Sequence, residues 1–380
     1  MGEVVPQGDS GVGRGIRGGV SAGTAASMVV ANMVGIGVFT SAGFQVEAVP
    51  SGFGILLLWL IGGVMALCGS LCYAELAAAL PRSGGEYHFL SRIFHPFPGF
   101  LSGWVSATVG FSAPIALAAM AFADYLAGAM PGLPRAPLAV GLVLVAAVVH
   151  SFNLGFAGAV QRISTWLKVL LIGGMCVALL VFGASQPVQF LPSPGDASLV
   201  FSAPFAVSLV FVMYSYSGWN SATYIAGEVR EPGRSLPLAL VGGTLAVTAL
   251  YVLINAAFLA SAPMAAMAGK VEVALVAARE AFGETGARVV AALIGLGLIS
   301  TVSAMTWAGP RVTLAMGEDH RALRWLARRN RAGLPVVALW VQTLLALVML
   351  LSASFKSVLL YVEFVLSVPL MMTILGVRWL

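Results

Sequence analysis

The chain has 380 residues, of which 59% are hydrophobic and 9% are charged, and its formal net charge is +5. Soluble globular domains carry about 25% charged residues. This composition therefore excludes a soluble globule and predicts an integral membrane protein. The basic excess is typical of loops on one side of a membrane, and a nucleic-acid partner is not expected.

Ten apolar segments are long enough to span a bilayer. They cover residues 24–48, 53–80, 99–130, 138–153, 160–182, 202–228, 238–261, 287–316, 334–352 and 355–379. A division after the fifth segment gives two sets of five, and an odd number of spans makes the second set enter from the opposite side. We therefore expect an all-α integral membrane fold with ten spans in a 5+5 inverted repeat.

This reading gives one transmembrane transporter domain over residues 24–380, with repeats at about 24–183 and 202–380. The preceding residues, 1–23, are Gly-rich and polar and run directly into a full-length span. They predict a disordered cytoplasmic N-terminus and no secretory signal.

Two of the apolar segments are interrupted near their middle. The first has Gly35 and Gly37 on either side of Ile36, and the sixth has weak helix formers from Tyr214 to Gly218. A break at that depth leaves backbone N–H and C=O groups that must face a cavity, protein or a bound solute. Broken spans in matching positions of two halves are typical of inverted-repeat carriers. The alternative is a Ser/Gly kink that only eases packing.

The same stretches carry motifs that resemble the amino acid-polyamine-organocation (APC) permeases. The motifs are Gly35-Ile36-Gly37-Val38-Phe39, Tyr216-Ser217-Gly218-Trp219-Asn220, Tyr73-Ala74-Glu75-Leu76 and Pro81-Arg82-Ser83-Gly84-Gly85-Glu86-Tyr87, followed by Glu228, Glu231-Pro232 and Leu236-Pro237. The resemblance implies a LeuT-like fold with discontinuous helices 1 and 6, and amino acid transport. Ile36 departs from the family, which often has a small hydroxyl residue there. Members usually carry two further helices, so we expect the ten-helix core without that pair.

An amino acid at the bilayer midplane needs N–H donors for its carboxylate and carbonyl oxygens for its ammonium. An unwound first helix supplies the donors and the positive end of a helix dipole, and the first half of the sixth helix supplies the carbonyls. By resemblance, Tyr214 is an aromatic gate and Asn220 adds a polar contact; the alternative for Tyr214 and Trp219 is helix packing. The predicted substrate-binding residues are Val34, Gly35, Ile36, Gly37, Tyr214, Ser215, Tyr216, Ser217, Gly218 and Asn220.

Two ionisable residues within the predicted spans are candidates for coupling. Glu363 lies about 12 Å along the tenth span, where it is a possible proton-coupling group or an acid in a wet vestibule. Lys168 lies about two turns into the fifth span and either snorkels to the headgroups or takes the place of a sodium ion. The second reading rests on resemblance to sodium-independent family members through Gln161, Thr165 and Lys168. It predicts hydrogen bonds near Gly35 and near Ser300 or Ser303.

Charge asymmetry gives the expected orientation. With the N-terminus in the cytoplasm, five of the 20 basic residues fall outside, and these are Arg135, Lys270, Arg279, Arg288 and Lys356. This bias agrees with the positive-inside rule. The basic run at 321–331 is expected to rest on anionic headgroups. The linkers 86–97 and 264–282 mix apolar and charged residues, as interfacial helices do.

These patterns predict a secondary carrier in the cell membrane that moves a neutral amino acid by sodium-independent alternating access, as an exchanger or proton symporter. The alternatives are an amine or polyamine carrier and a sensor or partner subunit that transports nothing. No nucleotide-binding loop, metal site, cofactor or catalytic pattern was found in the sequence, so an enzyme is not expected. The sequence does not define an oligomeric state.

Overall fold

The computed structural model describes residues 20–379 except 83, 153–154, 184 and 332, and it does not describe the side chains of 155–165 and 228. Regular structure in this part of the chain is helical, apart from an isolated bridge between Val20 and Val229. Most of the predicted N-terminal tail and the side chains of Gln161 and Thr165 lie outside the described residues.

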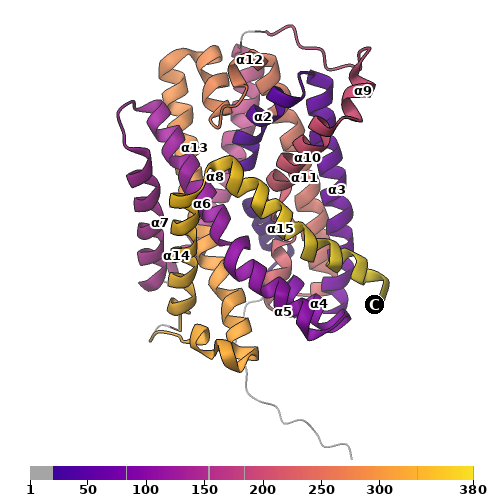
Figure 1. Cartoon of the computed structure of the whole chain (residues 1–380), viewed down its shortest axis with the longest axis vertical. Coiled ribbons are helices and arrows are strands. Elements are labelled where there is room, and N and C mark those ends of the chain that lie inside the picture. Colours follow the sequence, from indigo (N-terminus) through magenta and orange to yellow (C-terminus); the bar gives the residue numbers. More distant parts are fainter. Residues whose placement is uncertain (1–19, 83, 153–154, 184, 332, 380) are drawn as a thin grey trace, which may run out of the picture.

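The bundle consists of long helices joined by short ones, and Figure 1 shows α4 and α5 near one end, α12 near the other and α15 crossing obliquely. In chain order they are α1 (Ala22–Met33), α2 (Gly37–Ala48), α3 (Gly52–Ala79), α4 (Glu86–Ile93), α5 (Pro96–Val105), the π-helical turn η1 (Ser106–Gly110), α6 (Ser112–Ala129), α7 (Arg135–Phe152), α8 (Gly155–Phe182), α9 (Asp196–Val200), α10 (Ala203–Tyr216), the 3₁₀ helix η2 (Ser221–Glu228), α11 (Pro232–Ser261), α12 (Met264–Met267), α13 (Val273–Asp319), the 3₁₀ helix η3 (Arg321–Ala327), α14 (Val336–Ser352), α15 (Phe355–Gly376) and the 3₁₀ turn η4 (Val377–Trp379).

Many of these helices are long enough to cross a bilayer. Seven segments of the described chain are both long and apolar enough, at 22–48, 52–79, 96–129, 135–152, 232–261, 273–319 and 355–379. Two shorter apolar stretches are Trp166–Phe182 and Val336–Ser352. The protein is therefore a multi-pass helical membrane protein.

Three element boundaries differ from the sequence prediction. The first helix begins at Ala22, inside the predicted tail, because the Ser21 side chain accepts from Thr24 N and caps it. α11 begins at Pro232, not at residue 238, since proline is well suited to the first helical turn. α13 begins at Val273 within the predicted linker and is interrupted at Gly283, whose φ is 69°. The predicted linker 264–282 therefore forms α12 and the part of α13 that precedes Gly283.

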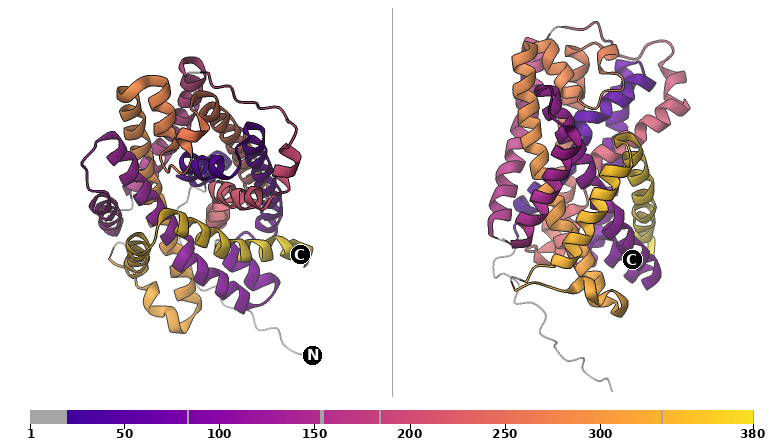
Figure 2. Two further views of the ribbon diagram at one scale, coloured as in Figure 1. Left: turned by 45° about the horizontal axis from the view of Figure 1, so that its top comes forward. Right: turned by 60° about the vertical axis from the view of Figure 1, so that its left-hand side comes forward.

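The two predicted interruptions lie against each other. The first falls between Met33 and Gly37, and the second follows Tyr216. A Cβ built on Gly37 would lie 2.6 Å from Ser215 Cα, so only glycine permits this approach of α2 to α10. Gly218 adopts a φ of +97°, which a residue with a side chain rarely tolerates. Figure 2 shows α2 at the centre of the bundle, where it is enclosed by the other helices.

A buried aromatic cluster supports the first interruption. Tyr251 donates to the carbonyl oxygen of Met33, the last residue of α1, at 2.5 Å. Its ring packs edge-on against Trp59, with centroids 5.4 Å apart. Tyr216 donates to Trp59 O at 2.9 Å. The cluster thus satisfies a carbonyl that a helix end would otherwise leave unpaired.

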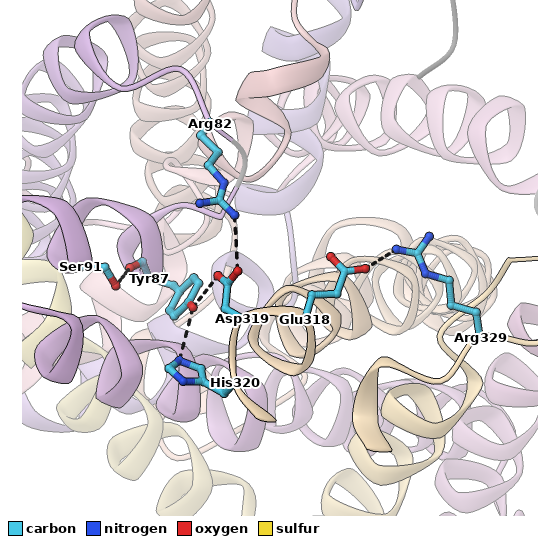
Figure 3. A network of polar contacts seen from close by, with 7 residues as sticks. All are labelled: Arg82, Tyr87, Ser91, Glu318, Asp319, His320 and Arg329. Carbon is cyan, nitrogen blue, oxygen red and sulfur yellow. Dashed lines mark hydrogen bonds and ion pairs between the residues drawn. The ribbon is translucent and has the colours of Figure 1, made fainter. Parts of the chain in front are cut away.

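A polar network ties α4 to the end of α13 (Figure 3). The Tyr87 hydroxyl donates to Asp319 Oδ2 at 2.7 Å, and Arg82 lies 3.7 Å from Asp319 Oδ1. Burial and the adjacent Asp319 carboxylate raise the pKa of Tyr87, so the phenol remains a donor at neutral pH. A separate exposed pair, Arg329 and Glu318, links the chain after η3 to the same helix end at 2.5 Å.

The Gly37 contact predicts a stability effect. Gly37→Ala places a methyl group against the α10 backbone, which can yield only if α2 moves, and overpacking of this kind costs about 1–3 kcal/mol. We expect a lower Tm in detergent. Gly242→Ala is the matched control, because a Cβ there meets nothing within 4 Å. Equal melting temperatures for the two variants would contradict the close-approach argument.

Candidate functional site

A cavity of about 140 Å³ lies where the two interrupted segments meet. One water molecule needs roughly 10–15 Å³ of such space, so the cavity can hold a small solute. Its walls come from both sides of the break in α1 and α2, from α10 and η2, and from α4, α5, α6, α13 and α15. Residues at both helix breaks therefore line one cavity.

Most of the predicted substrate-binding residues line this cavity. They are Gly35, Ile36, Gly37, Tyr214, Ser215, Ser217, Gly218 and Asn220. Val34 and Tyr216 do not line it: Val34 is buried in the core, and the Tyr216 hydroxyl is bonded to Trp59. Successive residues of a helix point in different directions, so not every residue beside a break can face the same cavity.

The backbone around the breaks has the polarity that the sequence predicts, with one difference. No side-chain hydrogen bond caps the start of α2, whose N-cap residue is Ile36. An uncapped helix start is suited to an anionic group. At the end of α10, Ser217 N donates to Tyr214 O at 3.0 Å, so this carbonyl already has a donor. Ser41 and Ser215 hydrogen-bond at 2.8 Å and hold the two segments together.

Lys168 is buried and lies behind the first break. Its Nζ donates to Thr301 Oγ1 at 2.8 Å. The acceptor is Thr301, which is adjacent to Ser300, one of the two serines near which the sequence predicts a bond. Ser303 instead lies 2.7 Å from His150 Nε2, and Ser300 Oγ has no partner among the described residues. About 100° of rotation separates neighbouring helical positions, so a one-residue error in register changes the partner.

Thr301 nonetheless connects Lys168 to the surroundings of Gly35. A Cβ built on Gly35 would lie 4.0 Å from Thr301 Cγ2, and both residues line the cavity. Lys168 itself is not a lining residue. Its ammonium therefore lies one side chain away from the broken backbone.

Glu363 of α15 is half-buried and lines the cavity. Tyr214 of α10 lines the same cavity. Within the described part of the chain, no hydrogen bond or ion pair satisfies the Glu363 carboxylate. The carboxylate thus faces the cavity without a protein partner in that part of the chain.

A second carboxylate, Glu86, was not among the predicted site residues. It begins α4, is buried and lines the cavity. Tyr73 donates to Oε1 at 3.0 Å, Tyr224 donates to Oε2 at 2.9 Å, and the Asn220 amide also donates to Oε1. Its sequence signal is an acid directly after Gly84 and Gly85, but the donors come from two other parts of the chain, α3 and the stretch 220–224.

Metal chemistry is not suggested by the arrangement. Among the described residues, no group of three or more His, Cys, Asp or Glu side chains is placed to hold a metal ion. A cavity lined by the unwound backbone of two membrane helices is the arrangement that secondary carriers use for a solute. The fold and site thus define a membrane protein of the carrier type.

Comparison with known sequences gives the family. Residues 21–380 match the family model described as "Amino acid permease". The chain belongs to the amino acid permease family, as the motifs around the two breaks predict.

Individual relatives share 28–30% identity with the chain. The chain is 30% identical to b(0,+)-type amino acid transporter 1 of Mus musculus over 61% of this chain and 49% of that protein. It is 28% identical to the Serine/threonine exchanger SteT of Bacillus subtilis over 86% of this chain and 75% of that protein. It is also 28% identical to Large neutral amino acids transporter small subunit 2 of Rattus norvegicus over 94% and 69%. The match thus covers about half the length of the first of these relatives.

The Glu86 cluster predicts a second stability effect. Tyr224→Phe removes the hydroxyl that donates to Glu86 Oε2, so this buried carboxylate oxygen loses a hydrogen bond. The loss should lower the free energy of unfolding by about 1–3 kcal/mol. We expect a lower Tm in detergent at neutral pH. Tyr361→Phe is the matched control, because Tyr361 is 54% exposed on α15. A Tyr224 variant as stable as the control would show that the bond contributes nothing.

Proposed function

We propose that the protein is a secondary carrier that moves amino acids across the cell membrane by alternating access. The observation that carries this proposal is the cavity between the interrupted α1/α2 and α10/η2 segments. An amino acid carboxylate fits the uncapped start of α2, and its ammonium fits the carbonyl end of α10. Two of the three relatives are named as transporters and the third, SteT, as an exchanger. These names support transport, and the name of SteT supports exchange.

The finer architecture is part of the same proposal. Ten spans in a 5+5 inverted repeat would place repeats at about 24–183 and 202–380, within one domain over 24–380. The two interruptions support this division, because each falls in the first span of its half. α10 and α14 would then be spans that are shorter than the rest. The protein would be a carrier and not an enzyme.

Coupling is proposed to be independent of sodium. Lys168 Nζ donates to Thr301, a cavity-wall residue beside Gly35, and its charged form would place a positive charge near the first break. Three donors on a compact charge suit scattered oxygen acceptors. Glu363 supplies a carboxylate that can take up a proton during the cycle; Tyr214, Tyr224 and Glu86 are the other titratable groups of the cavity wall among the described residues. Transport is then exchange or proton symport.

Counterflow in proteoliposomes tests both parts of this proposal. Liposomes preloaded with unlabelled amino acid should accumulate labelled amino acid equally with and without sodium. Lys168→Ala should lower the initial rate by tenfold or more, because the broken backbone loses its fixed cation. Lys356→Ala is the control, since Lys356 is exposed at the start of α15. Strict sodium dependence, or a wild-type rate in Lys168→Ala, would refute the coupling. A folded protein that exchanges no amino acid would favour the sensor alternative.

The proposed orientation puts the N-terminus and the basic loop after α13 in the cytoplasm. In a variant without its own cysteines, Arg328→Cys should resist an impermeant thiol reagent in intact cells. Lys356→Cys should react, because its loop is proposed to lie outside. Permeabilised cells should label both positions. Rapid labelling at position 328 in intact cells would reverse the orientation.

A further inference from the structure

The cavity wall is acidic. Its ionisable carboxylates are Glu86 and Glu363, and no lysine, arginine or histidine of the described residues lines it. The acids come from α4 and α15 and not from the breaks, which is why the sequence of the breaks alone favours a neutral solute. The field in the cavity should therefore favour a ligand with a net positive charge.

The two carboxylates differ in how they are satisfied. Glu86 accepts from Tyr73, Tyr224 and Asn220, and these bonds stabilise its charge without a ligand. Glu363 has no such donor in the described part of the chain. An unpaired charge within a membrane span is costly, so this carboxylate requires a proton or a cation.

We infer that Glu363 determines specificity by pairing with a positive group on the substrate side chain, so that the preferred substrate is an amino acid with a cationic side chain. This inference rests on the proposed function, because the two helix breaks must hold the α-carboxylate and α-ammonium. The Glu363 carboxylate is then free to pair with an ammonium or a guanidinium on the substrate side chain. With a neutral substrate, a proton would have to neutralise the carboxylate instead.

The surroundings of Glu363 suit such a side chain. Val362, Leu366 and Pro369 of the same helix also line the cavity and offer an apolar surface. A basic side chain has an aliphatic stem and a charged end, so the stem can lie on these residues while the charge reaches the carboxylate. Tyr214 also lines the cavity, and its ring can add a cation–π contact.

Lysine and norleucine provide the decisive comparison, because they share an aliphatic stem and differ in the terminal charge. In proteoliposomes, each unlabelled amino acid competes with labelled lysine or labelled norleucine for counterflow by wild-type protein. We expect the wild type to prefer lysine by about tenfold or more, the size of a good charge-assisted pair. Glu363→Gln should remove most of that preference by weakening lysine, while norleucine exchange changes less than about twofold. Glu363→Asp should keep the preference.

The control is Glu75→Gln, the same change at an exposed acid of α3 that does not line the cavity; it should leave the preference unchanged. A wild type that prefers norleucine, or a Glu363→Gln variant that weakens both solutes equally, overturns the inference. The wild-type competition decides the question alone if the variant does not fold. Exchange of norleucine without lysine refutes only this inference, whereas no exchange of any amino acid refutes the proposed function as well.

Discussion

The structure depends on how the membrane-embedded backbone is satisfied at two helix breaks. Hydrocarbon offers no hydrogen bonds, so each break must be satisfied by protein or by a ligand. At the end of α1, the Met33 carbonyl accepts from both Gly35 N and the Tyr251 hydroxyl. At the start of α2 there is no side-chain cap. The protein thus completes one side of the break and leaves the other suited to a solute.

Three ionisable side chains around the helix breaks, each buried or half-buried, differ in the hydrogen-bond partners that the protein gives them. Glu86 is surrounded by donors from α3 and from the chain around η2. Lys168 has one hydroxyl acceptor, Thr301. Glu363 has neither an opposite charge nor a donor among the described residues. Since an uncompensated charge is the most expensive of the three, Glu363 has the most to gain from a ligand.

The breaks were predictable because their causes are local: glycine and serine weaken a helix wherever they occur. Partners of the site residues were less predictable, because they depend on the rotation of one helix against another. Lys168 meets Thr301 instead of Ser300 or Ser303, and this difference arises from one helical position. Glu86 was missed for a related reason: Tyr73, Asn220 and Tyr224 are separated from it by 13, 134 and 138 residues.

The contacts around the site also differ in what it costs to break them. Ser41–Ser215 and Tyr251–Met33 are buried and join the broken segments to their neighbours, so separating them would leave unsatisfied groups in the core. The Arg82–Asp319 pair between α4 and α13 is exposed, with 65% and 36% of the two side chains accessible. Exposed ion pairs are worth about 0–1 kcal/mol. Buried contacts therefore hold the broken segments to their neighbours more strongly than the exposed ion pair holds the end of α13 to the chain before α4.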